Sequence, residues 1–372
     1  MDRDGGAGAA VIYLDYQATT PLAPEAWEAM APLLRDQFAN PHSAHRPGRA
    51  MAAQVEAARD EIAMLLPKDG RLLFTSGATE ALNLAIQGAP AGGIVTIATE
   101  HAAVLDTVDA MRRAGRAVTV LPADADGLID LDAAAHAIVP GVALVAAMLV
   151  NNEIGVVQPV AALAELAHAA GALFLCDAVQ GYGRVPVPQS CDMVAVSAHK
   201  IHGPKGVGAL WVRDEVRIEP LIHGGGQEGG LRSGTLSPAL CAGFGVAARL
   251  MRERQSRDAA HVEMLWDRAR ALLPDWHLNG SPERRYHGNL NLRREGLDGA
   301  RLLSECRNLA ISLGSACASG SGRPSHVLRA IGLNAAQARG SVRIGFGRYT
   351  TLAEVEDGAR AINEAADRQM AP

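Results

Sequence analysis

The sequence lacks the features that mark membrane proteins, disulfide-rich secreted domains and zinc proteins. Its longest uninterrupted apolar run covers residues 141–150, about half of what a bilayer-spanning helix needs. The five cysteines are odd in number, widely spaced and free of any Cys-x-x-Cys pair, which argues against a disulfide framework and a zinc site. The first ten residues contain no basic stretch leading into an apolar one, so we expect a cytoplasmic protein without a membrane partner.

An excess of basic charge is absent as well. The formal net charge is −5, whereas a nucleic-acid-binding protein of this size normally carries a basic stripe. We therefore expect no direct nucleic-acid partner. Aromatic residues make up only 4% of the 372 residues, but hydrophobic residues make up 48% and charged residues 20%, which indicates a globular protein with an aliphatic core.

Lysine is scarce in this chain. Only three of the 35 basic residues are lysines, namely Lys68, Lys200 and Lys205. Unlike arginine, lysine can lose its proton and act as a nucleophile. We interpret Lys68, in a Pro-Lys-Asp-Gly turn, as a product of biased composition, but the surroundings of Lys200 make it a candidate for chemistry.

Short apolar runs alternate with segments of helical periodicity over the first 215 residues, a pattern typical of a mostly parallel sheet covered by helices. The predicted strands are Leu72–Thr75, Ile94–Ala98, Ala117–Leu121, Ala143–Leu149, Leu173–Cys176, Met193–Ser197 and Gly208–Val212. The predicted helices between them are Ala78–Gln87, Ala102–Ala114, Leu131–Ile138 and Val160–Ala170. The fold class is therefore α/β, with a large three-layer domain built on a seven-stranded sheet.

Helical periodicity dominates from Ala239 to Leu273, and the last hundred residues mix short strands with helices. This change predicts a large domain over residues 13–258. A smaller α+β domain would then comprise residues 1–12 and 259–372 and carry a mobile loop around 314–325, where glycine and serine are frequent.

Polar residues directly after the strands are the first candidates for a site, because ligands of open α/β sheets bind beyond the carboxyl ends of the strands. Residues 76–79 form a small-residue turn that opens a helix, which indicates either a phosphate site or an ordinary helix cap. Asp177 follows one strand and Lys200 the next. A phosphate-type turn, an acid for a ring nitrogen and a lysine for a Schiff base are the set that holds pyridoxal 5′-phosphate, although Asp177 and Lys200 also fit a structural ion pair.

The chain resembles the cysteine desulfurases of the class V, fold-type I group of pyridoxal phosphate-dependent transferases, the NifS/IscS-like family. The resemblance runs from residues 14–21 to residues 347–351 and includes many ordered motifs. They are Phe74-Thr75-Ser76-Gly77-Ala78-Thr79-Glu80, Thr99-Glu100-His101, Asn151-Asn152-Glu153-Ile154-Gly155, Ser197-Ala198-His199-Lys200, Arg232-Ser233-Gly234-Thr235 and Gly314-Ser315-Ala316-Cys317-Ala318-Ser319.

The resemblance implies a role for each matching position. Lys200 would form the Schiff base, Asp177 would hold the ring nitrogen, and His101 would stack on the ring and shuttle protons. Arg343 would clamp the substrate carboxylate. The remaining implied cofactor contacts are Ala78, Thr79, Asn152, Gln180, Ser197 and His199, with Thr235 reaching the phosphate in the neighbouring subunit of a homodimer; Asn152 would also contact the substrate.

Cys317 separates this family from plain transaminases. Its Gly/Ser-rich surroundings suit a mobile loop, whereas Cys176 lies inside an apolar strand and reads as an inert core residue. The resemblance implies that Cys317 attacks the sulfur of L-cysteine and becomes a persulfide while L-alanine is released. An iron–sulfur scaffold protein or another acceptor would take the sulfur. No metal site of its own is expected, apart from Cys317 as a transient iron–sulfur ligand shared with a scaffold.

Two departures from the family pattern lie away from this chemistry, at Gly229 and at residues 287–291, and no long C-terminal extension is present. The acceptor pathway therefore stays open between housekeeping cluster assembly, nitrogenase maturation and DNA or tRNA thiolation. Two other functions compete with the desulfurase. One is a lyase for selenocysteine or cysteine sulfinate that does not need Cys317, and the other is a non-enzymatic platform for sulfur-transfer partners.

Overall fold

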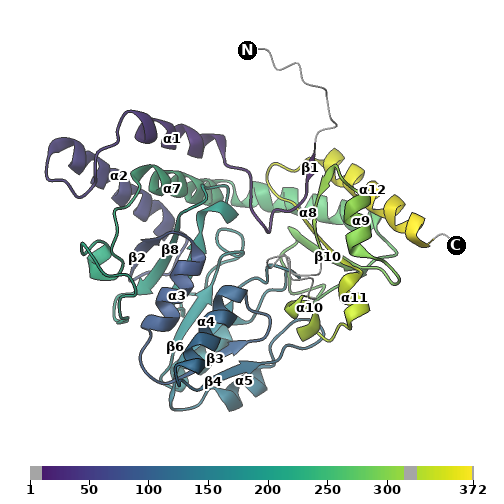
Figure 1. Ribbon diagram of the computed structural model, residues 1–372, viewed down its shortest axis with the longest axis horizontal. Coiled ribbons are helices and arrows are strands. Elements are labelled where there is room, and N and C mark those ends of the chain that lie inside the picture. Colours follow the sequence, from purple (N-terminus) through teal and green to yellow (C-terminus); the bar gives the residue numbers. More distant parts are fainter. Residues whose placement is uncertain (1–10, 314–324, 371–372) are drawn as a thin grey trace.

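The computed structural model describes residues 11–313 and 325–370 (Figure 1). At its centre lies a seven-stranded sheet in the order β2-β8-β7-β6-β5-β3-β4. Its strands are β2 (Gly70–Thr75), β3 (Gly93–Ile97), β4 (Val118–Leu121), β5 (Val142–Met148), β6 (Leu173–Asp177), β7 (Met193–Ser197) and β8 (Gly208–Arg213). The predicted strands and the α/β fold class are confirmed. Only β8 runs antiparallel to its neighbours β2 and β7.

Helices cover both faces of this sheet, as expected of a three-layer fold. Alternate side chains of each strand point to opposite faces, so Leu144 of β5 packs with α3 (Ala78–Gly88) and α4 (Ala102–Arg113). Its neighbour Val145 faces the other core. That core is closed by α2 (Arg46–Ala63), α5 (Leu131–Ala137), α6 (Val160–Ala169) and α7 (Pro238–Glu253). The four helices predicted between the strands are thereby confirmed as α3 to α6.

Two helices near the start of the chain were not predicted. The helices α1 (Pro24–Arg35) and α2 each begin with a proline in the first turn, where its missing N–H costs nothing. Both pack against α7 at one end of the molecule (Figure 1). This contact requires close approach, because a Cβ on Gly245 of α7 would lie 2.8 Å from the Cα atom of Ala58 in α2.

A second core lies at the other end of the molecule. An antiparallel sheet of order β12-β13-β10-β9 packs against three helices, α8, α9 and α12. Its elements are β9 (His277–Leu278), β10 (Asn289–Arg293), β12 (Ser312–Leu313), β13 (Ser341–Gly345), α8 (Gln255–Leu272), α9 (Gly299–Glu305) and α12 (Leu352–Met370). The strand β1 (Ile12–Tyr13) joins this end by pairing in parallel with β11 (Leu309–Ala310).

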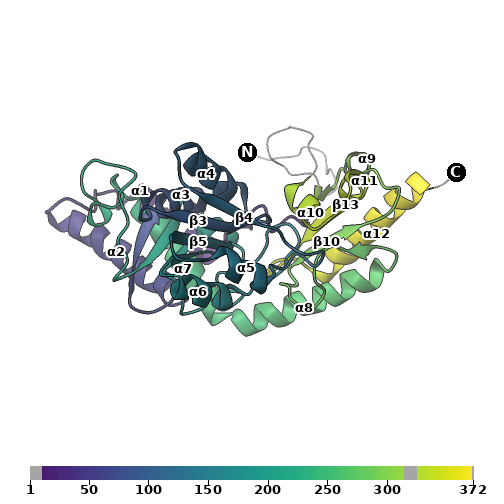
Figure 2. The same ribbon diagram turned by 90° about the horizontal axis from the view of Figure 1, so that it is seen from below.

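The helix α8 connects the two cores and runs along the lower edge of the view in Figure 2. Residue 258 lies in its first turns, so the predicted domain boundary falls within a continuous helix. The bounds 13–258, 1–12 and 259–372 stay a prediction. The short helices α10 (His326–Ala330) and α11 (Ala335–Arg339) pack with Ile154 and Val156 in a small core of their own. Most of the predicted loop around 314–325, with Cys317, lies outside the described residues.

Gly208, the first residue of β8, lies where an added side chain would meet backbone atoms of two neighbouring segments. A Cβ at Gly208 would lie 2.7 Å from both Cα and the carbonyl carbon of Gly77 and 2.7 Å from the carbonyl oxygen of Val196. These are backbone atoms, which cannot swing aside. We expect Gly208→Ala to lower the free energy of unfolding by about 1–3 kcal/mol, the usual cost of overpacking, measured by urea denaturation.

Gly93→Ala is the matched control for this change. Gly93 also begins a strand, but the nearest atoms to its added Cβ lie at 3.5 Å, which is ordinary contact. The control should unfold within about 1 kcal/mol of the parent. Equal urea midpoints for Gly208→Ala and the parent would contradict the prediction.

Candidate active site

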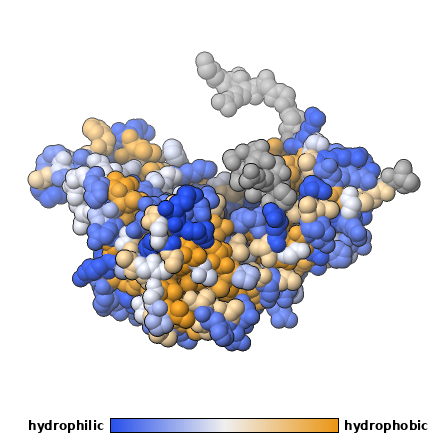
Figure 3. Space-filling view, turned by 60° about the horizontal axis from the view of Figure 1, so that its bottom comes forward, coloured by the Kyte–Doolittle hydropathy of each residue, from blue (hydrophilic) through white to orange (hydrophobic). Residues whose placement is uncertain are grey.

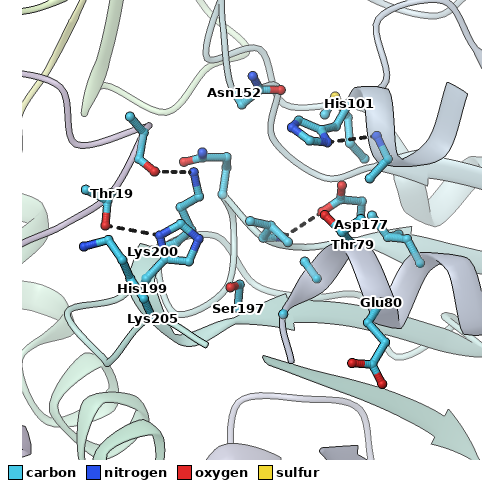
Figure 4. A pocket seen from close by; sticks show the side chains of 18 of the residues that line it. Thr19, Thr79, Glu80, His101, Asn152, Asp177, Ser197, His199, Lys200 and Lys205 are labelled. Carbon is cyan, nitrogen blue, oxygen red and sulfur yellow. Dashed lines mark hydrogen bonds between the residues drawn. The ribbon is translucent and has the colours of Figure 1, made fainter. Parts of the chain in front are cut away.

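A cavity of about 590 Å³ opens at the carboxyl ends of the central strands. Strands β2, β5, β6 and β7 each lead into a segment that lines it, as expected for a ligand site of an open α/β sheet. The structure brings into this cavity all but one of the predicted cofactor contacts. These are Ala78, Thr79, His101, Asn152, Asp177, Gln180, Ser197, His199 and Lys200. Figure 4 shows most of them around the cavity.

Lys200 ends the short 3₁₀ helix η1 (Ala198–Lys200) that follows β7. Its Nζ atom donates to the carbonyl oxygens of Gln17 and Ala18, the latter at 2.9 Å. No carboxylate pairs with Nζ among the described residues. Burial, with Arg343 and Arg184 nearby, lowers the pKa of Lys200 to about 8. A sizeable fraction of the amine is therefore neutral near pH 7 to 8, which is the form that can act as a nucleophile.

Asp177 is the last residue of β6 and is buried. Its Oδ1 atom accepts a hydrogen bond from the backbone N–H of Val179 at 3.0 Å. Burial raises the pKa of Asp177, while the charges of His101 and Lys200 act in the opposite direction. A cation placed beside Asp177, such as a protonated ring nitrogen, therefore stabilises the charged form of this carboxylate. An ion pair between Asp177 and Lys200 is not formed, since Lys200 bonds to carbonyl groups instead.

The N-terminus of α3 supplies a site for an anion at the same cavity. Its cap is Gly77, which has no side chain to occupy the free N–H groups of the first turn. The following residues Ala78 and Thr79 line the cavity. Helix N-termini with free N–H groups bind phosphate through hydrogen bonds and the helix dipole. The buried acid, the partly neutral lysine and this helix end together fit the ring nitrogen, aldehyde and phosphate of pyridoxal phosphate.

Three further side chains complete the wall of the cavity. His101 is the N-cap of α4, and its Nδ1 atom accepts from the N–H of Ala103 at 3.1 Å (Figure 4). This bond fixes the ring at the cavity edge. Gln180 donates to the carbonyl oxygen of Gln17 at 2.9 Å, and His199 bonds to Thr19 Oγ1 at 3.2 Å. These two hydrogen bonds hold the segment that follows β1 against the cavity.

Two predicted site residues do not line the cavity, and a third is not among the described residues. Arg343 of β13 does not line the cavity; it pairs with Asp15 at 2.8 Å and donates to the carbonyl oxygen of the cavity residue Asn152 at 3.1 Å. Thr235 is exposed and away from the cavity of its own chain. Cys317 lies outside the described residues. The clamp, the neighbouring-subunit contact and the persulfide role stay predictions.

Glu100 is a buried acid that the sequence analysis did not assign to the site. Its Oε1 atom accepts from the backbone N–H of Met148 at 2.6 Å, and Oε2 has no partner among the described residues. Met148 pairs with Asp177 across β5 and β6, so the two acids are neighbours. Burial, followed by the charge of Asp177, raises the pKa of Glu100 well above its usual range. The sequence signal for Glu100 was its position directly before His101 in the motif Thr99-Glu100-His101.

The chain matches the family model described as aminotransferase class V over residues 12–357. It belongs to this family. A curated relative, cysteine desulfurase IscS of Rickettsia typhi, is 41% identical over 380 residues, which cover 97% of this chain and 93% of the relative. The chain thus falls among the NifS/IscS-like cysteine desulfurases of that family, which are enzymes that depend on pyridoxal phosphate.

Solved structures agree with this assignment. A NifS-like protein from Rickettsia africae superposes with a TM-score of 0.88 at 30% identity, covering 96% of this chain and 99% of that one. SspA, solved in complex with cysteine, gives a TM-score of 0.82 at 36% identity, with 91% and 99% covered. The fold-type I architecture and the pyridoxal phosphate prediction are confirmed.

Proposed function

We propose that this chain removes sulfur from L-cysteine, releases L-alanine and carries the sulfur as a persulfide on Cys317 before passing it to an acceptor. The main support for this proposal is the cavity in which Lys200, Asp177 and the N-terminus of α3 lie together. Its geometry fits the cofactor on which the family depends, and its relatives of about 41% identity are named cysteine desulfurases.

Each group at the cavity has a distinct task in this proposal. The cofactor supplies an electron sink for charge that develops at the substrate Cα atom. Lys200, whose amine is partly neutral, removes the Cα proton and can return it at the end of the cycle. Asp177 holds the ring nitrogen in its protonated form. Arg343, tied to Asn152 at the cavity wall, binds the substrate carboxylate.

Cys317 is the sulfur acceptor by comparison with the other cysteines. Cys176, Cys191, Cys241 and Cys306 are all buried. Burial raises the pKa of Cys241 to about 12. The hydrogen bond with neighbouring Cys191, followed by burial, raises the pKa of Cys176 well above its usual range. A thiolate is the reactive form, so these thiols are poor nucleophiles. When Cys317 attacks the substrate sulfur, an S–S bond forms, the C–S bond breaks, and its electron pair stays on carbon, which is protonated to give alanine.

The described residues that flank the segment 314–324 adjoin the cavity wall. On one side, Ser312 bonds to Asp15 and to Arg343, both at 2.9 Å. On the other side, Ser325 bonds to Glu153, the neighbour of the cavity residue Asn152. These hydrogen bonds hold the residues at both ends of the segment near the cavity, which supports the assignment of Cys317 as the sulfur acceptor.

The proposal includes a cytoplasmic homodimer that hands sulfur to an iron–sulfur scaffold protein or another acceptor. Thr235, exposed in one chain, is free to reach the phosphate site of a second copy.

The surface offers hydrophobic side chains for contact with a second copy or an acceptor. Such side chains gather over the middle of the face shown in Figure 3. Phe38, which follows α1, is 82% exposed. Within residues 11–313 and 325–370, no helix is long and apolar enough to cross a bilayer.

The experiment that tests the proposed function measures both products of one turnover. The protein loaded with pyridoxal phosphate is mixed with L-cysteine without reductant, and alanine and protein-bound sulfur are quantified. We expect about one alanine and one persulfide per active site, followed by continuous alanine release once a thiol reductant is added. Pyruvate and ammonia in place of alanine, or no product, would contradict the proposal.

A further inference from the structure

We infer that Lys205 is the positively charged residue that balances the phosphate group held at the N-terminus of α3. The inference rests on the proposed function, because it concerns the cofactor of that site. Lys205 lines the same cavity as Gly77, Ala78 and Thr79. It follows the 3₁₀ helix of Lys200 by five positions, and Figure 4 places it next to His199 on the Lys200 side of the cavity.

His199, Lys200 and the arginines near the cavity are not available for this task. Burial, followed by the charges of Lys200 and Lys205, lowers the pKa of His199 to about 4, so His199 is neutral at pH 7. Lys200 loses its charge when it acts as the nucleophile. Arg232 is bound to Glu80 at 2.6 Å, and neither Arg232 nor Arg343 lines the cavity.

Lys205 itself has no hydrogen bond or ion pair among the described residues. It is exposed, so its ammonium group is free to move toward a ligand. A bound phosphate monoester carries a charge of about −1.5 to −2 at pH 7, whereas a helix N-terminus supplies only about half a positive charge. The helix alone therefore leaves most of this charge unbalanced. Among the described residues, Lys205 is the only lysine or arginine besides Lys200 that lines the cavity.

Lysine suits this position at the cavity edge better than arginine, whose planar guanidinium group has fixed donor directions. The flexible stem of lysine carries a compact charge that can follow a solvent-exposed phosphate. The chain otherwise uses arginine for positive charge and has lysine at only two further places, the nucleophile Lys200 and the exposed turn residue Lys68. The scarcity of lysine and the location of Lys205 thus point to the same site.

The test compares binding of pyridoxal phosphate with binding of pyridoxal, which lacks the phosphate, by the cofactor-free protein. Binding is followed by absorbance and therefore does not depend on catalytic turnover. We expect Lys205→Met to raise the Kd of pyridoxal phosphate on the order of tenfold, as for loss of one charge-assisted contact. The Kd of pyridoxal should stay within about twofold, because no phosphate contact is lost.

Two variants control this comparison. Lys205→Arg keeps the charge and should bind pyridoxal phosphate within about threefold of the parent. Lys68→Met makes the same substitution at the exposed turn lysine and should leave both Kd values unchanged. An unchanged Kd of pyridoxal phosphate in Lys205→Met would overturn the inference, and so would an equal loss for both ligands.

Two further outcomes separate this inference from the proposed function. A raised KM for L-cysteine in Lys205→Met, with both Kd values unchanged, would assign the lysine to the substrate carboxylate and overturn the inference alone. A parent protein that takes up neither pyridoxal phosphate nor pyridoxal would overturn the proposed function and this inference with it.

Discussion

Lys200→Ala should lower kcat/KM for alanine formation from L-cysteine by about 10³–10⁴-fold, the range for loss of a general base and nucleophile. The variant removes a cavity amine whose pKa is lowered to about 8, close to neutrality. The anion site at α3 and the carboxylate of Asp177 do not depend on this side chain. The variant should therefore still bind pyridoxal phosphate, but reversibly.

The measurement combines the rate of alanine release with borohydride reduction of the loaded protein. The parent should keep the cofactor covalently attached after reduction and unfolding, and Lys200→Ala should lose it. Lys200→Arg, which keeps a cation but cannot provide a neutral amine, should be as inactive as the alanine variant. Activity above about one per cent of the parent in either variant would contradict the role of Lys200.

The strands of the central sheet could be predicted because their sequence signal is strong. Strands such as β7, in which every residue is buried, appear as short apolar runs between turns and helices. The helix α2 gave a weaker signal: its buried residues Gly48, Met51, Val55, Ala58 and Ile62 have helical spacing, but the glycine and alanine among them differ little from the alanines on its other faces. Strands of two residues, such as β9, are too short to show any periodicity.

The polar side chains at the strand ends could be predicted for a related reason. Asp177 ends β6, and Lys200 lies three residues after the end of β7, so sheet topology alone places them at one edge. Contacts between distant parts of the chain could not be derived in this way. Arg343 bonds to Asp15, 328 positions away, and Glu100 bonds to the N–H of Met148, 48 positions away. Both depend on how segments pack after folding.

The neighbouring acids at the cavity have a consequence for its charge. Glu100 and Asp177 are both buried and next to β5, and two carboxylates in such a place do not both ionise readily. Burial and the charge of Asp177 raise the pKa of Glu100 well above its usual range, which favours the neutral form of Glu100 and the charged form of Asp177, the group that faces the cavity. This arrangement thereby favours a single charged carboxylate at the cavity, which can pair with a single protonated ring nitrogen.

Cys317→Ala should reduce alanine formation from L-cysteine by at least about 10³-fold, since the nucleophile that takes the sulfur is removed. Lys200, Asp177 and the α3 anion site remain, so the variant should bind pyridoxal phosphate and L-cysteine like the parent. It should also form no persulfide, because the remaining cysteines are buried. Alanine, bound sulfur and the absorbance change on L-cysteine addition are measured side by side with the parent.

Cysteine sulfinate and selenocysteine serve as the discriminating substrates in the same comparison. Their sulfinate and selenium groups can leave without attack by a thiolate, so a cavity that only has to activate the Cα proton should process them in both proteins. We expect Cys317→Ala to keep alanine formation from these two substrates within about tenfold of the parent while it loses turnover of L-cysteine. Comparable alanine from L-cysteine in both proteins would instead make Cys317 dispensable and favour a lyase. Loss of all three activities would show that the substitution damages the cavity and would leave the sulfur transfer unassigned to Cys317.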